Sequence, residues 1–235
     1  MKNIMKGVIG IILLLFIGCS DDDGSPTTGG GTDTGGLTAS ANYNITFTTD
    51  FTEAEFPQDY PSNANFGTIV VITHSPEVSV YQLGQIASEG LRDYASSGDI
   101  DGLASFISAD LGEAGDGLFT ISTAGTAGVT DEVNTSVTFT PTRTRLTFLA
   151  RLNPSPDWFL GVSSFDITNG NTLIDNASFN LGPIDAGVVA GTTYTASEGT
   201  ESLAIANYTG APFSDGSAPF VSPLGLLEIT RQSQN

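Results

Sequence analysis

Basic residues are scarce in this sequence. Lysine and arginine together number 7, against 26 aspartates and glutamates, and the formal net charge is −19. Lys2 and Lys6 both precede Cys19, so residues 19–235 contain no lysine. This composition argues strongly against a nucleic-acid partner, because a protein that binds phosphates needs a basic surface to neutralise them. It argues equally against attraction to anionic lipid headgroups through surface charge.

Cysteine and histidine occur once each, as Cys19 and His74. A single cysteine forms no internal disulfide, so the folded part must depend on its hydrophobic core or on a metal. A zinc site would have too few ligands of the usual kinds. His74 and Ser75 do not indicate a catalytic pair, because neighbours on a strand point to opposite faces. No Gly-x-Ser-x-Gly turn is present either. We therefore expect no enzyme.

The first 18 residues have the features of a secretory signal. Two lysines precede an uncharged run of eleven residues, 7–17. This run is too short for a transmembrane helix, which needs about 20 residues, but suits the core of a signal peptide. The run ends in Phe16-Ile17-Gly18-Cys19, which resembles a bacterial lipobox except that leucine is commoner than Phe16. The sequence therefore predicts cleavage before Cys19 and a lipid anchor on Cys19 that attaches the protein to a membrane.

Residues 19–40 are expected to form a flexible tether. They are rich in glycine, serine, threonine and aspartate and show no apolar period, and such a chain would have a root-mean-square reach of roughly 25 Å. The acidic run at residues 21–23 resembles the surface-export signal of Bacteroidota lipoproteins. It predicts an outer-membrane lipoprotein exposed at the cell surface; the alternative is that the run only begins a solvated linker.

Residues 41–235 form the predicted folded domain. Apolar and polar residues alternate at 43–48, as in a half-buried strand, while the β-branched run 68–73 indicates a strand covered on both faces. Apolar spacing predicts a helix over 81–96 and a second one capped by Asp99. Six short strands follow, at 118–122, 135–140, 145–152, 159–163, 178–181 and 226–230. We expect a mainly β protein, an antiparallel β-sandwich with a one- or two-helix insertion.

Three blocks of the sequence resemble the spondin-domain family, the N-terminal module of F-spondin and mindin. The first is His74-Ser75 followed by Ala-Ser-Glu-Gly-Leu-Arg-Asp-Tyr-Ala at 87–95. The second, and most specific, is Pro-Ser-Pro-Asp-Trp-Phe-Leu-Gly-Val at 154–162, and the third is Leu-Gly-Pro-Ile-Asp-Ala-Gly at 181–187. The resemblance implies a sandwich similar to calcium-dependent lipid-binding domains, with a bound calcium. It also implies an extracellular, adhesive role like that of the animal members.

The resemblance makes Asp157 and Asp185 candidate metal ligands, because both match family positions that carry calcium. Two other positions depart from the family. The family usually has a second aspartate where this sequence has Val189, and a glutamate of some members falls near Thr138. Calcium prefers six to eight oxygen ligands, so each missing carboxylate should weaken binding.

Nothing in the sequence places Asp166 or Asp175 where they would compensate for these losses. The alternative interpretation is that Asp157 and Asp185 are structural and accept backbone hydrogen bonds in tight turns. Trp158, the sole tryptophan, is expected in the core, as are Tyr81 and Tyr94.

The predicted function is a lipid-anchored binding or adhesion module of the bacterial envelope, which recognises an extracellular protein or glycan and depends on calcium. One alternative is a structural envelope lipoprotein without an external ligand. A second is a carboxylate-dependent extracellular hydrolase, since many acidic pairs are available but no spacing marks one out.

Overall fold

The computed structural model describes residues 39–111, 117–170, 172–196, 202–214 and 222–233. The predictions for the signal segment 1–18, for Cys19 and for the acidic run lie outside the described residues, as does all but the end of the tether 19–40. A search of the described ranges finds no helix that is long and apolar enough to span a membrane.

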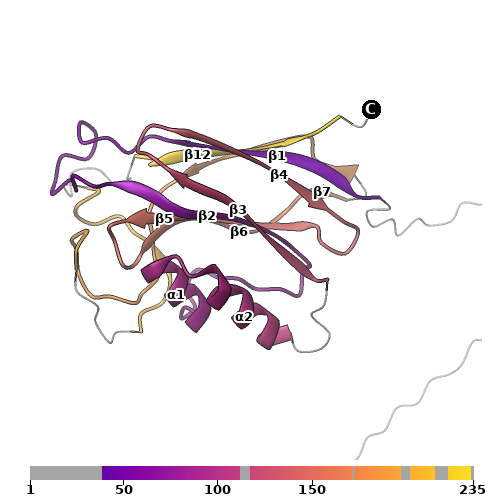
Figure 1. Ribbon diagram of the computed structural model, residues 1–235, viewed down its shortest axis with the longest axis horizontal. Helices are drawn as coiled ribbons and strands as arrows, with labels where there is room; N and C mark the ends of the chain where they lie inside the picture. Colours follow the sequence, from indigo (N-terminus) through magenta and orange to yellow (C-terminus); the bar gives the residue numbers. More distant parts are fainter. Residues whose placement is uncertain (1–38, 112–116, 171, 197–201, 215–221, 234–235) are drawn as a thin grey trace, which may run out of the picture. The chain divides into compact units, whose positions relative to one another are not determined.

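Two antiparallel sheets face each other in the folded domain (Figure 1). One is four-stranded, in the order β4 (Glu132–Phe139), β1 (Ala41–Thr49), β12 (Gly225–Arg231) and β9 (Asn176–Leu181). The other has six strands, in the order β11 (Ala206–Asn207), β10 (Ile184–Asp185), β6 (Trp158–Asp166), β5 (Arg145–Asn153), β2 (Asn65–His74) and β3 (Phe119–Ala127). Strands β7 (Thr168–Asn169) and β8 (Thr172–Leu173) form a small hairpin. The predicted mainly β sandwich is confirmed.

Every second side chain of β1 points into the space between the two sheets. Tyr43, Ile45 and Phe47 are almost completely buried, while the residues between them point outward. The Phe47 ring lies 5.5 Å from that of Phe66 and 5.1 Å from that of Phe148, both on the six-stranded sheet. Aromatic pairs at this spacing add to the free energy gained by burial. The two sheets are therefore joined by an aromatic-rich core.

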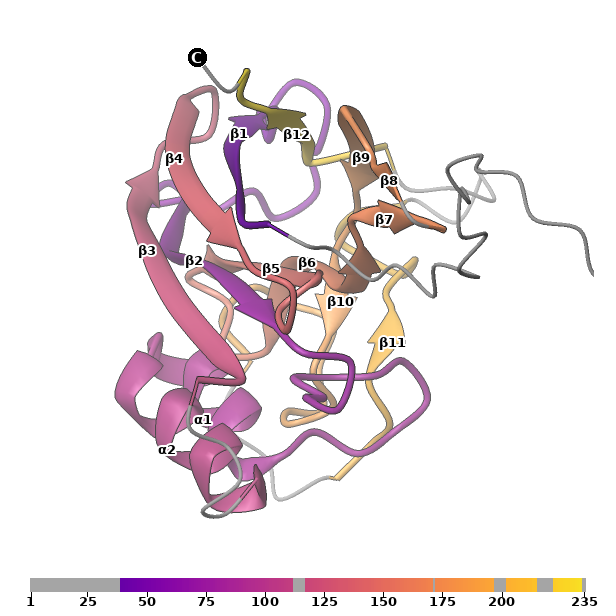
Figure 2. The ribbon, with the colours of Figure 1, turned by 90° about the vertical axis from the view of Figure 1, so that its right-hand side faces the viewer.

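Two helices cover the other face of the six-stranded sheet (Figure 2). Helix α1 (Glu89–Ser97) begins where Ser88 accepts a hydrogen bond from the Leu91 N–H, and it ends at Gly98 in the left-handed conformation. Asp99 caps α2 (Ile100–Leu111), as predicted, through the Gly102 N–H. These helices explain the β-branched run of β2, which is buried on both faces. The apolar layer between helices and sheet includes Val70, Ile72, Leu91, Tyr94, Leu103, Ile107 and Leu149.

The predicted helix over 81–96 is wrong in its first half, because α1 begins only at Glu89. Gly84 adopts φ +85°, which a right-handed helix does not allow, and its N–H donates to the Ile205 carbonyl at 2.8 Å. The Ile205 N–H in turn donates to the Gln85 carbonyl. Pairing with a distant segment therefore replaces the helix, and Leu83, which the helical spacing had placed on the buried face, is 45% exposed.

Arg151 links the six-stranded sheet to the end of α1. From β5 its guanidinium donates to the carbonyls of Ala95, at 2.8 Å, and Ser96, at 2.5 Å. It also donates to the Ser155 carbonyl at 3.3 Å and to the Asn153 side chain. A cation favours the C-terminal end of a helix, where carbonyl groups lack intrahelical donors. One side chain thus holds α1 against the loop that precedes β6.

Candidate functional site

Asp157 and Asp185 are brought together by the pairing of two strands. Asp157 immediately precedes β6, Asp185 lies in β10, and the antiparallel register places Trp158 opposite Asp185. The Ala186 N–H donates to the Asp157 carbonyl at 3.1 Å, which continues the pairing. Asp157 is 3% exposed, whereas Asp185 is only partly buried. The two residues that the sequence singled out therefore form one carboxyl pair.

This carboxyl pair holds the loop that follows β10. The Asp157 side chain accepts the N–H groups of Val188 at 3.2 Å and Val189 at 2.9 Å, one on each oxygen. Asp185 accepts the Gly187 N–H at 2.7 Å on Oδ1 and the Trp158 indole N–H at 3.4 Å on Oδ2. The structural role foreseen as the alternative for both residues is thus present, because each accepts backbone hydrogen bonds in a turn.

Two local features shape the site. The Ser155 hydroxyl oxygen accepts the N–H groups of Asp157 at 3.1 Å and Trp158 at 2.9 Å, which sets the direction of the chain into β6. Gly187 has φ +70°, and a Cβ there would lie 2.2 Å from the Leu203 carbonyl oxygen. Only glycine suits this position, because a side chain would clash with the backbone of Leu203 and because residues with a Cβ rarely adopt this φ. The Leu203 N–H bonds the Gly187 carbonyl at 3.0 Å and closes the loop.

Burial, and then the nearby charge of Asp185, raise the pKa of Asp157 to about 6. The N–H groups of Val189 and Val188 act in the opposite direction, because they stabilise the ionised form, but they do not cancel the rise. At neutral pH the site therefore holds two like charges close together in a partly desolvated position. A cation beside the pair would relieve this repulsion.

The pair fits calcium in its chemistry but offers few ligands. Carboxylate oxygens are hard donors of the kind that calcium prefers. However, among the residues that the structure describes, no group of three or more histidine, cysteine, aspartate or glutamate side chains gathers where it would hold a metal. Val189 is buried and packs in the apolar layer beneath the helices. Most ligands of a bound ion would therefore have to be backbone carbonyls and water.

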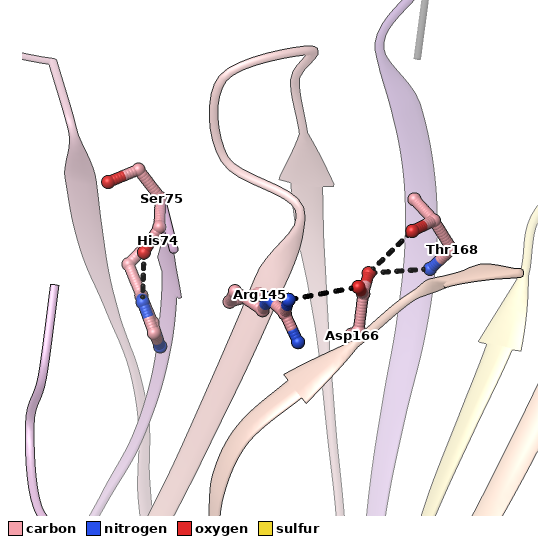
Figure 3. A network of polar contacts seen from close by, with 5 residues as sticks. All are labelled: His74, Ser75, Arg145, Asp166 and Thr168. Atoms are coloured by element: carbon pink, nitrogen blue, oxygen red, sulfur yellow. Dashed lines mark hydrogen bonds and ion pairs between the residues drawn. The ribbon is translucent and has the colours of Figure 1, made fainter. Parts of the chain in front are cut away.

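The other positions considered for the site lie elsewhere. Thr138 is on the outer face of β4, where its hydroxyl donates to the Asn42 side chain at 2.7 Å. Asp166 is at the opposite end of β6, about 26 Å from Trp158 along the strand. It accepts the Thr168 N–H and hydroxyl and pairs with Arg145 at 3.1 Å (Figure 3). Asp175 lies 3.8 Å from the guanidinium of Arg231. None of the three joins the carboxyl pair.

His74 is a structural residue. It is fully buried, its Nδ1 lies 2.8 Å from the Ser75 carbonyl, and its Nε2 lies 2.9 Å from the Thr147 hydroxyl. Because a carbonyl only accepts, Nδ1 carries the proton and the Thr147 hydroxyl donates to Nε2. Figure 3 shows the Ser75 hydroxyl pointing away from the His74 ring, so these neighbours do not form a nucleophile and base. Burial lowers the pKa of His74.

Trp158 lies in the core beside the carboxyl pair, as expected, and is 2% exposed. Its ring packs against Phe213 at 4.8 Å, Tyr208 at 4.9 Å and Tyr194 at 5.5 Å. Periodicity did not reveal these three residues as partners of Trp158, because they come from a loop-rich segment without strand periodicity. Their only signal was the recurrence of aromatic residues between Tyr194 and Phe213.

Comparison with known proteins agrees with this structure. The model of the Spondin_N family matches residues 41–225. Spondin-2 of Homo sapiens is 32% identical over 161 residues, which cover 67% of this chain and 48% of that protein. Spondin-1 of Xenopus laevis is 31% identical over 66% of this chain and 20% of its own length, and Spondin-1 of Gallus gallus is 28% identical over 83% and 26%. The chain thus spans about half the length of Spondin-2 and less of Spondin-1. It belongs to the Spondin_N family.

Proposed function

We propose that this protein is an extracellular binding module, held at the surface of the bacterial outer membrane by a lipid on Cys19 and strengthened by calcium. The observation that carries the proposal is the carboxyl pair, because Asp157 and Asp185 meet at one loop on a rigid sandwich. Membership of the Spondin_N family supports an extracellular binding role. The partner would be an extracellular protein or a glycan.

Calcium, when bound, would supply positive charge between two carboxylates that otherwise repel each other. The ligands from this chain would be Asp157 and Asp185, whose oxygens already accept the N–H groups of Gly187, Val188 and Val189. Because the same carboxylates hold the loop, occupancy of the site would stiffen residues 186–189. Weak binding is expected, since only two carboxylates contribute.

Thermal unfolding of the purified protein tests the metal. Calcium should raise the thermal midpoint above its value in EDTA, because a ligand that binds only the folded state stabilises it. Asp157→Asn should abolish this rise, while Asp110→Asn, at an exposed position on α2, should preserve it. A parent protein that does not respond to calcium would show that the site holds none.

Binding and anchoring need separate measurements. The full chain is applied to arrays of extracellular proteins and glycans with calcium or with EDTA, and binding to no surface would favour the structural-lipoprotein alternative. Incorporation of labelled palmitate into the wild-type chain, and its loss in Cys19→Ala, tests the anchor.

The hydrolase alternative has less support from the carboxyl pair, because the burial of Asp157 keeps it from a polymeric substrate.

A further inference from the structure

The outer face of the four-stranded sheet carries an unusual set of side chains. This sheet lies on the side of the molecule opposite the helices (Figure 2). Its outward-pointing residues, here called the amide–hydroxyl face, are Asn42, Asn44, Thr46, Thr48, Glu132, Asn134, Ser136, Thr138, Asn176, Ser178, Asn180, Leu226, Glu228, Thr230 and Gln232. All except Glu132, Glu228 and Leu226 are amides or hydroxyls. The face includes neither a cation nor an aromatic ring.

The strand register arranges these side chains in rows. Asn44 lies opposite Ser136 on one side and Thr230 on the other, and Thr230 lies opposite Asn176. The next row along the strands runs in the same way through Asn134, Thr46, Glu228 and Ser178. Neighbouring strands in a sheet are about 4.8 Å apart. The result is a regular grid of donors and acceptors on one surface.

Hydrogen bonds fix several members of the grid. The Thr46 hydroxyl donates to the Asn134 amide oxygen at 2.6 Å, and the Asn134 NH₂ donates to Glu132 at 2.9 Å. The Gln232 NH₂ donates to the amide oxygen of Asn44 and, at 2.9 Å, to the Ser136 hydroxyl. Amides held by a neighbour lose less rotational freedom when a ligand binds, so less binding free energy is lost in ordering them.

Two hollows border the β12–β9 side of this face. One, of about 330 Å³, is lined by Thr48, Asn180 and Leu226 of this face and also by Asp50 and Glu55. The other, of about 470 Å³, is lined by Asn176, Thr230 and Gln232 of this face and also by the ion pair of Asp175 and Arg231. Leu226 and Thr230 are four residues apart on β12, a separation of about 13 Å. A short, extended oligomer would reach from one hollow to the other.

The chemistry of the face selects the class of ligand. A polyanion is disfavoured, because the charged groups of the face and of the first hollow are all carboxylates, Arg231 at the second hollow is paired with Asp175, and the chain has a net charge of −19. A stable protein interface is disfavoured, because such interfaces have an apolar core and Leu226 is the only apolar side chain here. Amides and hydroxyls offer both donors and acceptors, which is what the hydroxyl groups of a sugar require.

We propose that an uncharged polysaccharide binds across the amide–hydroxyl face, with an extended segment lying along β12 and β9 between the two hollows. This inference rests on the proposed binding function and names a ligand class for it. It uses a different surface from the carboxyl pair, so it requires no metal.

The test is affinity electrophoresis of the full-length protein in gels that contain galactomannan, a mixed-linkage β-glucan or xylan, with polygalacturonate as the charged comparison. At least one neutral polymer should retard the protein in EDTA, and polygalacturonate should not. The double variant Asn176→Ala/Asn180→Ala removes two exposed amides next to the hollows. It should weaken binding by about fivefold or more for each hydrogen bond lost.

The matched control is Asn169→Ala/Asn207→Ala, which removes two exposed amides from β7 and β11, outside the face. It should bind like the wild type, and thermal midpoints confirm that both double variants are folded. Equal binding by the two variants would overturn the location while leaving a binding function in place. Binding to a protein on the array, and to no neutral polymer, would overturn the ligand class. The ligand class would also be overturned if sedimentation showed that the wild type is a dimer and that only the Asn176→Ala/Asn180→Ala variant is a monomer.

Discussion

Asp157, just before β6, and Asp185, in the paired strand β10, bind consecutive N–H groups of a single loop. Asp185 accepts the N–H of Gly187, and Asp157 accepts those of Val188 and Val189. The loop therefore depends on both carboxylates at once, although their charges repel each other. Stability and pH are therefore coupled at this point of the molecule, and a bound cation would be coupled to both.

The pH dependence of stability should reveal the free-energy cost of ionising Asp157 in this buried pair. The pKa of Asp157 in the folded protein, about 6, is above its ordinary value of 3.8, so the folded state binds the proton more tightly than the unfolded state. This contribution to stability is complete below pH 4 and is lost as the pH rises through about 6. In EDTA, we expect the contribution of Asp157 to lower the thermal midpoint by roughly 5 °C between pH 4.5 and pH 7.

Asp185→Asn isolates the contribution of the neighbouring charge to that dependence. Removing the neighbouring charge should lower the pKa of Asp157 and flatten the curve of midpoint against pH, whereas Asp110→Asn should leave the curve unchanged. Calorimetry between pH 4.5 and 7.5 measures all three proteins. Parallel curves for the wild type and Asp185→Asn would contradict a role for the charge of Asp185.

Restoring the family carboxylate should strengthen calcium binding. Val189→Asp adds a third carboxylate to the loop, so we expect a larger calcium-induced rise of the thermal midpoint than in the wild type. The metal-free variant should be less stable, because Val189 packs in the apolar layer. Val189→Asn, of equal size but uncharged, is the control. Equal calcium shifts in the two variants would show that position 189 does not reach the ion.

Substitutions at Gly187, in the loop, and at Gly170, outside it, compare the cost of a clash with the cost of a positive φ. Both have positive φ, +70° and +62°, but a Cβ at Gly170 has no atom within 4 Å, whereas one at Gly187 meets the Leu203 backbone. Gly170→Ala should cost about 1 kcal/mol of unfolding free energy, the cost of the φ alone. Gly187→Ala should cost about 3 kcal/mol or more, because backbone must move. Denaturant unfolding measures both, and equal costs would mean that the loop adjusts freely.

His74 offers a clear spectroscopic test because it is the only histidine. Since burial lowers its pKa, its ring resonances should not titrate near pH 6.5 in the folded protein, and should do so in urea. The stability that comes from the neutral ring is present above pH 6.5 and decreases as the pH falls below it. Nitrogen chemical shifts should identify the tautomer protonated at Nδ1. A folded-state titration near pH 6.5 would rule out this environment.

Arg151 should contribute far more to stability than a surface arginine. Arg151→Met leaves the carbonyls of Ala95, Ser96 and Ser155 without this donor, so we expect a loss of about 2–3 kcal/mol. Arg92→Met, which removes one bond to Ser202, should change the free energy of unfolding by under about 0.5 kcal/mol. Urea unfolding compares them. Similar losses would mean that the link between α1 and β5 is energetically unimportant.

Much of the fold could be predicted from local patterns. Alternation revealed β1 because one of its faces is buried and the other is exposed, and the β-branched run revealed β2 because helices cover its second face. The start of α1 was missed because a distant segment, through Ile205, holds Gly84 and Gln85 in a turn. Spacing alone carries no information about such a competing partner.

The site could be predicted only in part. Family positions identified Asp157 and Asp185, and the β6–β10 register brings them together. The family glutamate position was matched to Thr138, which lies away from the pair for a different reason: β4 belongs to the four-stranded sheet, whereas β6 and β10 belong to the six-stranded sheet. The amide–hydroxyl face was equally hidden, because β12 pairs with β1 from the other end of the chain. Each of its strands had to be placed before the rows became visible.

The pairing of β1 with β12 has a consequence for protein engineering. Tyr43 lies opposite Arg231, and the Gln232 N–H donates to the Asn42 carbonyl at 2.9 Å. The start of β1 therefore lies beside the end of β12. A short glycine-rich linker between residues 233 and 40 would therefore join them into a continuous backbone. Reopening this circularly permuted chain at Gly170, between β7 and β8, would create new termini without cutting either large sheet.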